Sequence, residues 1–118
     1  MFKIINNVIL LTRGDKAVFD FSIDNYIFTR GDKVVFAVYD KKGLENPPLI
    51  KKEKIIEDDS KVIQFELNSL DTKIGKIVNK PTEYWYEIQL NEDQTVLGYD
   101  TNGPKLLILY PEGADINV

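Results

Sequence analysis

The side chains in this sequence that could perform acid–base or metal chemistry are almost entirely carboxylates. The chain has 118 residues, including 19 Asp and Glu but no His and no Cys. The absence of His and Cys excludes imidazole and thiolate ligands, Ser-His-Asp triads, Cys nucleophiles and disulfides. Two carboxylates can act together as acid and base in a glycosidase, so the acidic residues are the catalytic set to examine.

Three short acidic groups stand out: Asp58-Asp59, Glu92-Asp93, and Asp100 with Asn102. The first two fall where the chain is expected to turn between strands, and acidic residues are common in such turns. Asp100 and Asn102 could join a calcium loop, but the EF-hand ligand pattern is absent. The seven glycines are scattered and form no phosphate-binding loop. The sequence therefore predicts a protein that is not an enzyme and has no metal, cofactor or small-molecule substrate.

The aromatic triplet Tyr84-Trp85-Tyr86 is the second chemical feature. Successive side chains of a strand point to opposite faces, so Trp85 is expected to face away from a core that holds the two tyrosines. An outward aromatic ring could stack on a sugar, as in carbohydrate-binding sandwiches. It could equally pack beneath a loop or at a protein interface. Both interpretations remain open at the level of sequence.

Short runs in which apolar and polar residues alternate dominate the chain, and turn residues separate them. A period of two is typical of strands. The expected strands are Ile4–Leu11, Ala17–Asp24, Lys33–Asp40, Leu49–Glu57, Lys61–Leu67, Tyr84–Leu90, Thr95–Tyr99 and Lys105–Tyr110. Their spacing predicts an all-β fold of about seven to nine antiparallel strands, arranged as a sandwich or a barrel. The β-sandwich is favoured because one strand, Lys33–Asp40, is expected to be covered on both faces. The fourth and fifth runs are expected to pair as a hairpin around residues 58–60.

Residues 1–110 are expected to form a single domain, because no linker or low-complexity segment divides them. Residues 111–118 are expected to form a flexible C-terminal tail. Lys33–Asp40 is apolar at both alternating sets of positions and is expected to be covered on both faces. The expected core consists of apolar residues at alternate positions: Phe19, Phe21, Phe36, Val38, Tyr86, Ile88 and Leu90.

A short repeat precedes two of the expected strands. Residues 12–19 and 29–36 match at seven of eight positions, and each copy contains Arg-Gly-Asp. This tripeptide occurs in integrin ligands, but here both copies run directly into a strand, which favours a structural turn. We expect Gly14 and Gly31 to adopt a positive φ, and Asp15 and Asp32 to accept backbone N–H bonds.

Charge and hydropathy narrow the range of partners. The net charge is −4, whereas a nucleic-acid-binding domain usually presents a basic face. The sequence has no apolar run of membrane-spanning length and no signal-peptide pattern, so we expect cytoplasmic synthesis and no membrane contact. Lys105–Tyr110 is apolar on both faces, and one core cannot cover both. The candidate partner-contact residues are therefore the outward ones, Trp85, Leu106, Ile108 and Tyr110.

Several turn-and-strand segments, in order along the chain, resemble small Ig-like proteins encoded in phage and prophage tail gene clusters of Gram-positive bacteria. They are similar to the N-terminal domain of baseplate upper proteins. The segments that carry the resemblance are residues 12–21, 31–38, 48–52, 70–73, 84–90, 98–104 and 110–113.

The resemblance implies an Ig-like fold and a non-catalytic structural or adaptor role in a phage tail or baseplate. The partners it implies are other tail proteins or copies of the same chain. It also implies synthesis in the bacterial cytoplasm and a place in the virion after assembly. The alternative function is a β-sandwich module that binds glycans or a host surface.

Overall fold

The computed structural model describes residues 1–40, 46–76 and 79–113. These residues form nine strands in two sheets that do not close into a barrel, which confirms the all-β prediction. The strands are β1 (Phe2–Ile5), β2 (Val8–Thr12), β3 (Ala17–Phe21), β4 (Lys33–Asp40), β5 (Ile50–Ile55), β6 (Ile63–Leu67), β7 (Thr82–Leu90), β8 (Gln94–Leu97) and β9 (Lys105–Tyr110).

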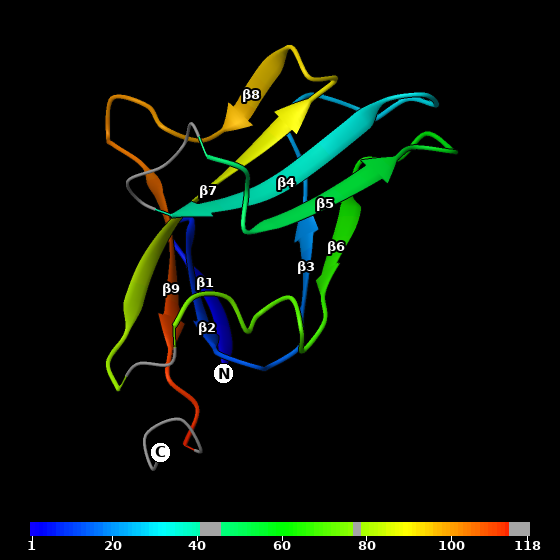
Figure 1. Cartoon of the computed structure of the whole chain (residues 1–118). Helices are drawn as coiled ribbons and strands as arrows, with labels where there is room; N and C mark the ends of the chain where they lie inside the picture. The colour runs from blue at the N-terminus through cyan, green and yellow to red at the C-terminus, as the bar shows by residue number, and fades with distance from the viewer. Residues whose placement is uncertain (41–45, 77–78, 114–118) are drawn as a thin grey trace.

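The larger sheet has seven strands in the order β1-β2-β9-β7-β4-β5, and β8 pairs with β7 beside that path. The smaller sheet contains β3 and β6, which stand together beside the larger sheet in Figure 1. The expectation of a wholly antiparallel arrangement is wrong for one pair. Strands β2 and β9 are parallel, with Ile9 opposite Leu107 and Thr12 opposite Tyr110.

An unexpected hairpin precedes this parallel pair. The run expected as one strand, Ile4–Leu11, divides into β1 and β2 at Asn6 and Asn7, whose φ angles are +49° and +66°. Two consecutive positive φ values are typical of a tight two-residue hairpin turn, and Asn tolerates them better than most residues. The hairpin places β1 antiparallel to β2 at the edge of the sheet, and on its other side β2 pairs with β9 in the parallel direction.

The expected hairpin between the fourth and fifth runs is also wrong. Strand β5 pairs with β4 in the larger sheet, and β6 pairs with β3 in the smaller one. The chain passes between the sheets over residues 56–62, where Phe28 and Ser60 form an isolated β-bridge. Ile56 is buried within this crossing. The crossing therefore anchors an apolar side chain instead of making a simple turn.

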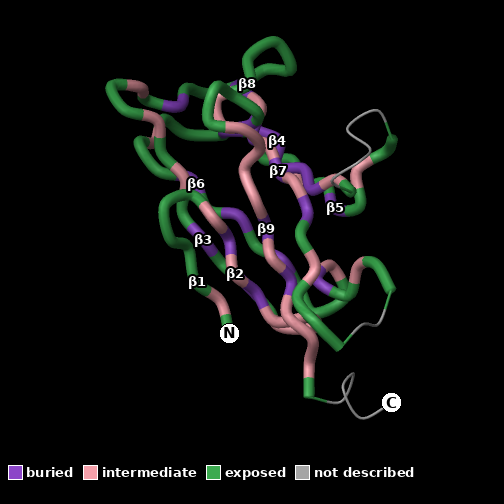
Figure 2. Tube along the Cα trace, turned by 90° about the vertical axis from the view of Figure 1, so that its left-hand side faces the viewer, coloured by how far each residue is buried: buried purple, intermediate pink, exposed green. Residues whose placement is uncertain are grey.

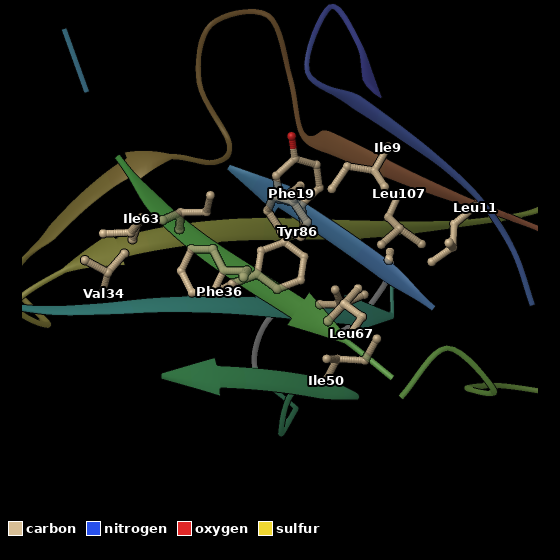
Figure 3. Packing of buried hydrophobic residues seen from close by; sticks show 14 of the residues in the cluster. Ile9, Leu11, Phe19, Val34, Phe36, Ile50, Ile63, Leu67, Tyr86 and Leu107 are labelled. Atoms are coloured by element: carbon tan, nitrogen blue, oxygen red, sulfur yellow. The ribbon is translucent and has the colours of Figure 1, made fainter. Parts of the chain in front are cut away.

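The core lies between the two sheets and is rich in aromatic rings (Figure 3). The ring centroid of Phe36 lies 5.2 Å from that of Phe19 and 5.6 Å from that of Tyr86. Such separations are favourable for aromatic pairs. Six of the seven expected core residues are buried, and the seventh, Phe21, is partly buried and packs against the buried cluster.

The other face of the larger sheet is an outer face, and it is apolar in places. In β9, Leu107 and Leu109 are buried in the core, whereas Leu106, Ile108 and Tyr110 are only partly buried. Figure 2 shows this mixture of burial classes along β9. The expected cover on both faces of β4 is confirmed, because Val35 and Ala37 on its outer face are 7% and 3% exposed. Side chains of the same sheet surround these two residues.

Candidate functional site

The four predicted partner-contact residues all belong to the outer face of the larger sheet. Trp85 of β7 lies opposite Leu106 of β9, and Ile108 lies between Leu10 of β2 and Glu83 of β7. Tyr110 continues the same face beyond Ile108. Together with their neighbours they form a partly exposed apolar surface that we call the outer band: Val8, Leu10, Trp85, Leu106, Ile108 and Tyr110.

Trp85 lies at the margin of the outer band and has aromatic neighbours. Tyr84 and Tyr86 are buried at 6% and 4% exposure, whereas the intervening Trp85 is partly exposed. Its ring centroid lies 5.8 Å from that of Tyr99, at an interplanar angle of 56°. Tyr39 of β4 lies opposite Trp85 across the β4–β7 pairing. The strand register brings Tyr39 beside Trp85, and the ring contact brings Tyr99 to the same region.

A groove of about 250 Å³ adjoins these aromatic residues, and we call it the outer groove. The side chains of Val35 and Ala37 in β4 contribute to its lining. Pro48, two residues before the start of β5, also lines the groove. The complete set of lining residues is Val35, Ala37, Tyr39, Pro48, Lys51, Glu87, Gln89 and Glu92. The groove thus combines an apolar floor with charged and amide side chains.

Hydrogen bonds hold the polar side chains of the groove in place. The Tyr39 hydroxyl and the Gln89 amide both donate to Oε1 of Glu87, at 3.3 and 3.1 Å. Burial, together with the charge of Glu87, raises the pKa of Tyr39, so its phenol remains a donor at neutral pH. This arrangement fixes the carboxylate of Glu87 on the outer face.

Two lysines balance the acidic residues around the groove. Lys33 Nζ lies 2.6 Å from Glu92 Oε1, and this hydrogen bond lowers the pKa of Glu92. Lys51 Nζ lies 3.2 Å from Glu53 Oε1, which lowers the pKa of Glu53 in the same way. The groove consequently carries both signs of charge.

The two Arg-Gly-Asp turns share a backbone feature but have different contacts. Gly14 and Gly31 have φ angles of +86° and +93°. The Asp15 carboxylate accepts from the N-terminal ammonium of Met1, and its backbone carbonyl accepts from the Thr72 hydroxyl at 2.8 Å. One turn precedes β3 and the other precedes β4, and the hydrogen bonds of Asp15 and Asp32 go to different parts of the chain.

Asp32 is the centre of a more extensive network. Its Oδ2 accepts from the Thr29 backbone N–H at 2.9 Å and from the Tyr26 hydroxyl at 2.6 Å. Its Oδ1 accepts from the Asn91 amide at 3.1 Å. These bonds, that of Tyr26 above all, lower the pKa of Asp32 to about 2. The network joins the turn before β4 to the turn after β7.

The predicted acidic groups are dispersed over the surface and have local partners. Asp59 Oδ1 accepts from the Arg30 backbone N–H at 3.2 Å. Asp100 Oδ2 lies 2.8 Å from Lys105 Nζ, and its Oδ1 accepts from the Asn102 backbone N–H. Within residues 1–40, 46–76 and 79–113, no three acidic side chains are grouped as metal ligands.

The same described residues include no helix long and apolar enough to cross a membrane.

Sequence reasoning missed Tyr39 and Tyr99 as members of the aromatic region. Glu87 and Gln89 share the parity of Trp85 along one strand, so the sequence does place these three on one face. Tyr39 joins them only through the β4–β7 register, and Tyr99 comes from the segment after β8. A single strand pattern carries no signal for either residue.

No protein-family model and no curated protein matches the chain.

Proposed function

We propose that this chain is a non-catalytic contact module that binds protein through the outer band. In this proposal the fold is an Ig-like sandwich, and the module is a structural or adaptor part of a phage tail or baseplate. Its partners are other tail proteins or copies of the same chain. It is made in the bacterial cytoplasm and carried in the virion after assembly.

The single observation that supports the contact role is the apolar outer face of β2 and β9. Leu10 and Ile108 lie opposite each other in adjacent strands, with Leu106 on the same face. The smaller sheet packs on the opposite face of these strands, where Leu107 and Leu109 join the core. Removing such surface from water contributes about 25 cal/mol per Å², which favours association with a partner.

The tail or baseplate assignment has separate support. It depends on the resemblance of the turn and strand segments described above, especially residues 84–90 and 98–104. In the structure these residues lie in β7, which supplies Trp85 to the outer band, and in the segment before β9, whose Tyr99 ring contacts that of Trp85. A tail component of this kind needs a stable fold and a contact surface, and the outer band supplies the surface.

Light scattering over a concentration series tests the contact role. We expect the wild-type protein to associate at high micromolar concentration, and we expect the variant Ile108→Glu to remain monomeric. A charge at position 108 would have to lose its hydration in the interface, which opposes association. Val18→Glu is the matched control, because Val18 is an apolar strand residue of the smaller sheet and is 40% exposed.

Two results are required if the outer band is the contact surface. Val18→Glu must associate as the wild-type protein does, and Ile108→Glu must retain the wild-type urea midpoint. A wild-type protein that is monomeric at about 1 mM would exclude self-association, since this concentration detects even a weak dimer. Equal association of the wild type and Ile108→Glu would show that the outer band is not the contact surface.

A further inference from the structure

We propose that the outer groove binds a neutral oligosaccharide, a function that goes beyond the protein contact described above. A pyranose ring has an apolar face of C–H groups and a rim of hydroxyls. A protein that binds it must present an aromatic surface beside hydrogen-bonding groups. Trp85 and Tyr39 adjoin Glu87 and Gln89 on the outer face in this way.

The aromatic side of the site consists of rings that are partly or largely exposed and so open to a ligand. Tyr99 is 64% exposed, although its ring contacts that of Trp85. Tyr39 both lines the groove and lies opposite Trp85 in the neighbouring strand, so the rings and the groove form one continuous surface. A sugar ring stacked on Trp85 or Tyr99 would therefore extend directly into the groove.

The polar side of the site is preorganised by the bonds to Glu87. Tyr39 and Gln89 both donate to Oε1 of this carboxylate, so Oε2 remains as an acceptor for a sugar hydroxyl. The Gln89 carbonyl oxygen supplies a further acceptor, and the Lys51 ammonium in the lining supplies a donor. Hydroxyls on adjacent carbons of one sugar could bond to several of these groups together.

Charge and size favour a neutral sugar over other ligands. Glu87 and Glu92 would repel an anionic sugar or a phosphate, and Lys51 and the nearby Lys33 would repel a basic peptide. The groove volume of about 250 Å³ lies close to the lower end of small-molecule pockets. A stable protein interface needs about 800 Å² on each partner, which this groove alone does not offer.

The test uses the fluorescence of Trp85, the one tryptophan of the chain. The protein is titrated with neutral gluco-, xylo-, manno-, galacto- and N-acetylglucosamine oligosaccharides. We expect a saturating change in fluorescence for at least one of them, with a Kd of about 0.1–1 mM. Trp85 adjoins the groove through Tyr39 and Glu87, so its fluorescence responds to a ligand bound there, and the titration is done at low micromolar protein, below the concentration at which self-association is expected.

Two variants retain the Trp85 reporter, and each removes either a polar or an aromatic group of the proposed site. Glu87→Gln removes the charged acceptor and Tyr99→Ala removes the exposed ring, and each should weaken binding at least about fivefold. Tyr110→Ala is the matched control, because Tyr110 lies on the same outer face but does not line the groove. It should bind as the wild type does, and all three variants should keep the wild-type urea midpoint.

Three results would overturn the proposal. The first is the absence of a saturating change with every sugar at about 10 mM. The second is unchanged affinity in both Glu87→Gln and Tyr99→Ala. The third is a response to a Lys- and Arg-rich peptide that salt abolishes, without a response to sugars, which would assign the groove to a cationic ligand.

Discussion

Replacement of Asp32 by Asn should destabilise the protein in a manner that depends strongly on pH. Asp32 is only 9% exposed and accepts hydrogen bonds from Tyr26, Thr29 and Asn91. Asn has nearly the same shape and can still accept from the backbone N–H. The substitution therefore removes chiefly the negative charge to which the other donors are oriented.

The size of the effect follows from the pKa of Asp32, which the network lowers from 3.8 to about 2. Each pKa unit corresponds to about 1.4 kcal/mol, so the charged form contributes about 2 kcal/mol to the free energy of unfolding. Because the folded-state pKa is below the unfolded one, this contribution is fully present above about pH 4. It is lost as the pH falls from about 4 through about 2, and below that pH both states bind the proton.

Urea unfolding followed by Trp85 fluorescence between pH 7 and pH 2 measures this difference. Asp32→Asn should be about 2 kcal/mol less stable than the wild type at pH 7, and the two proteins should converge near pH 2. Asp20→Asn is the control, because Asp20 is an exposed carboxylate of β3. Its effect should stay within about 0.5 kcal/mol throughout. A difference for Asp32→Asn that does not change with pH would refute the reasoning.

Two further predictions concern the core. Phe36 is fully buried between the sheets, so Phe36→Ala should lower the free energy of unfolding by about 3–5 kcal/mol in urea titrations; a loss below about 1 kcal/mol would contradict its place in the core. Burial raises the pKa of Tyr86 to about 12, so wild-type stability should fall as the pH rises above 10, and Tyr86→Phe should show less of this fall in alkaline urea titrations. Identical alkaline slopes would count against this assignment.

The sequence predicts the composition of the core well because β3, β6 and β7 alternate regularly between buried and more exposed positions, whereas β4 is apolar on both faces. Within β4, Phe36 belongs to the alternate residues whose side chains point towards the smaller sheet. Tyr86 and Ile88 do the same within β7. The sheet partners were harder to predict. The pairing of β2 with β9 joins residues near opposite ends of the chain, and no local pattern encodes such a contact.

The turns show which local signals sequence reasoning can use and which it misses. Asn6 and Asn7 between two apolar runs are a hairpin signal, and their positive φ angles show that it was available. Residues 56–62 also have turn-forming composition, yet they carry the chain between sheets because Ile56 is buried and Ser60 bonds to Phe28. Composition alone did not distinguish these two cases.

The same limit applies to the candidate site. The sequence placed Trp85, Leu106 and Ile108 on outward positions, since each strand pattern is local. It did not combine Trp85 with Tyr39 and Tyr99, because these three residues come from three separate segments. Their proximity depends on strand register, which is a property of the whole sheet.

The parallel pairing of β2 and β9 has a mechanical consequence. The chain enters β2 at Val8 and leaves β9 at Tyr110, and these residues lie at opposite ends of the paired strands. Once β1 has peeled away, tension along the chain would pull β2 and β9 past each other lengthwise. That geometry loads their inter-strand hydrogen bonds together and not one after another. The pair would therefore resist stretching more strongly than a hairpin opened from its end, and would act as a clamp under tension.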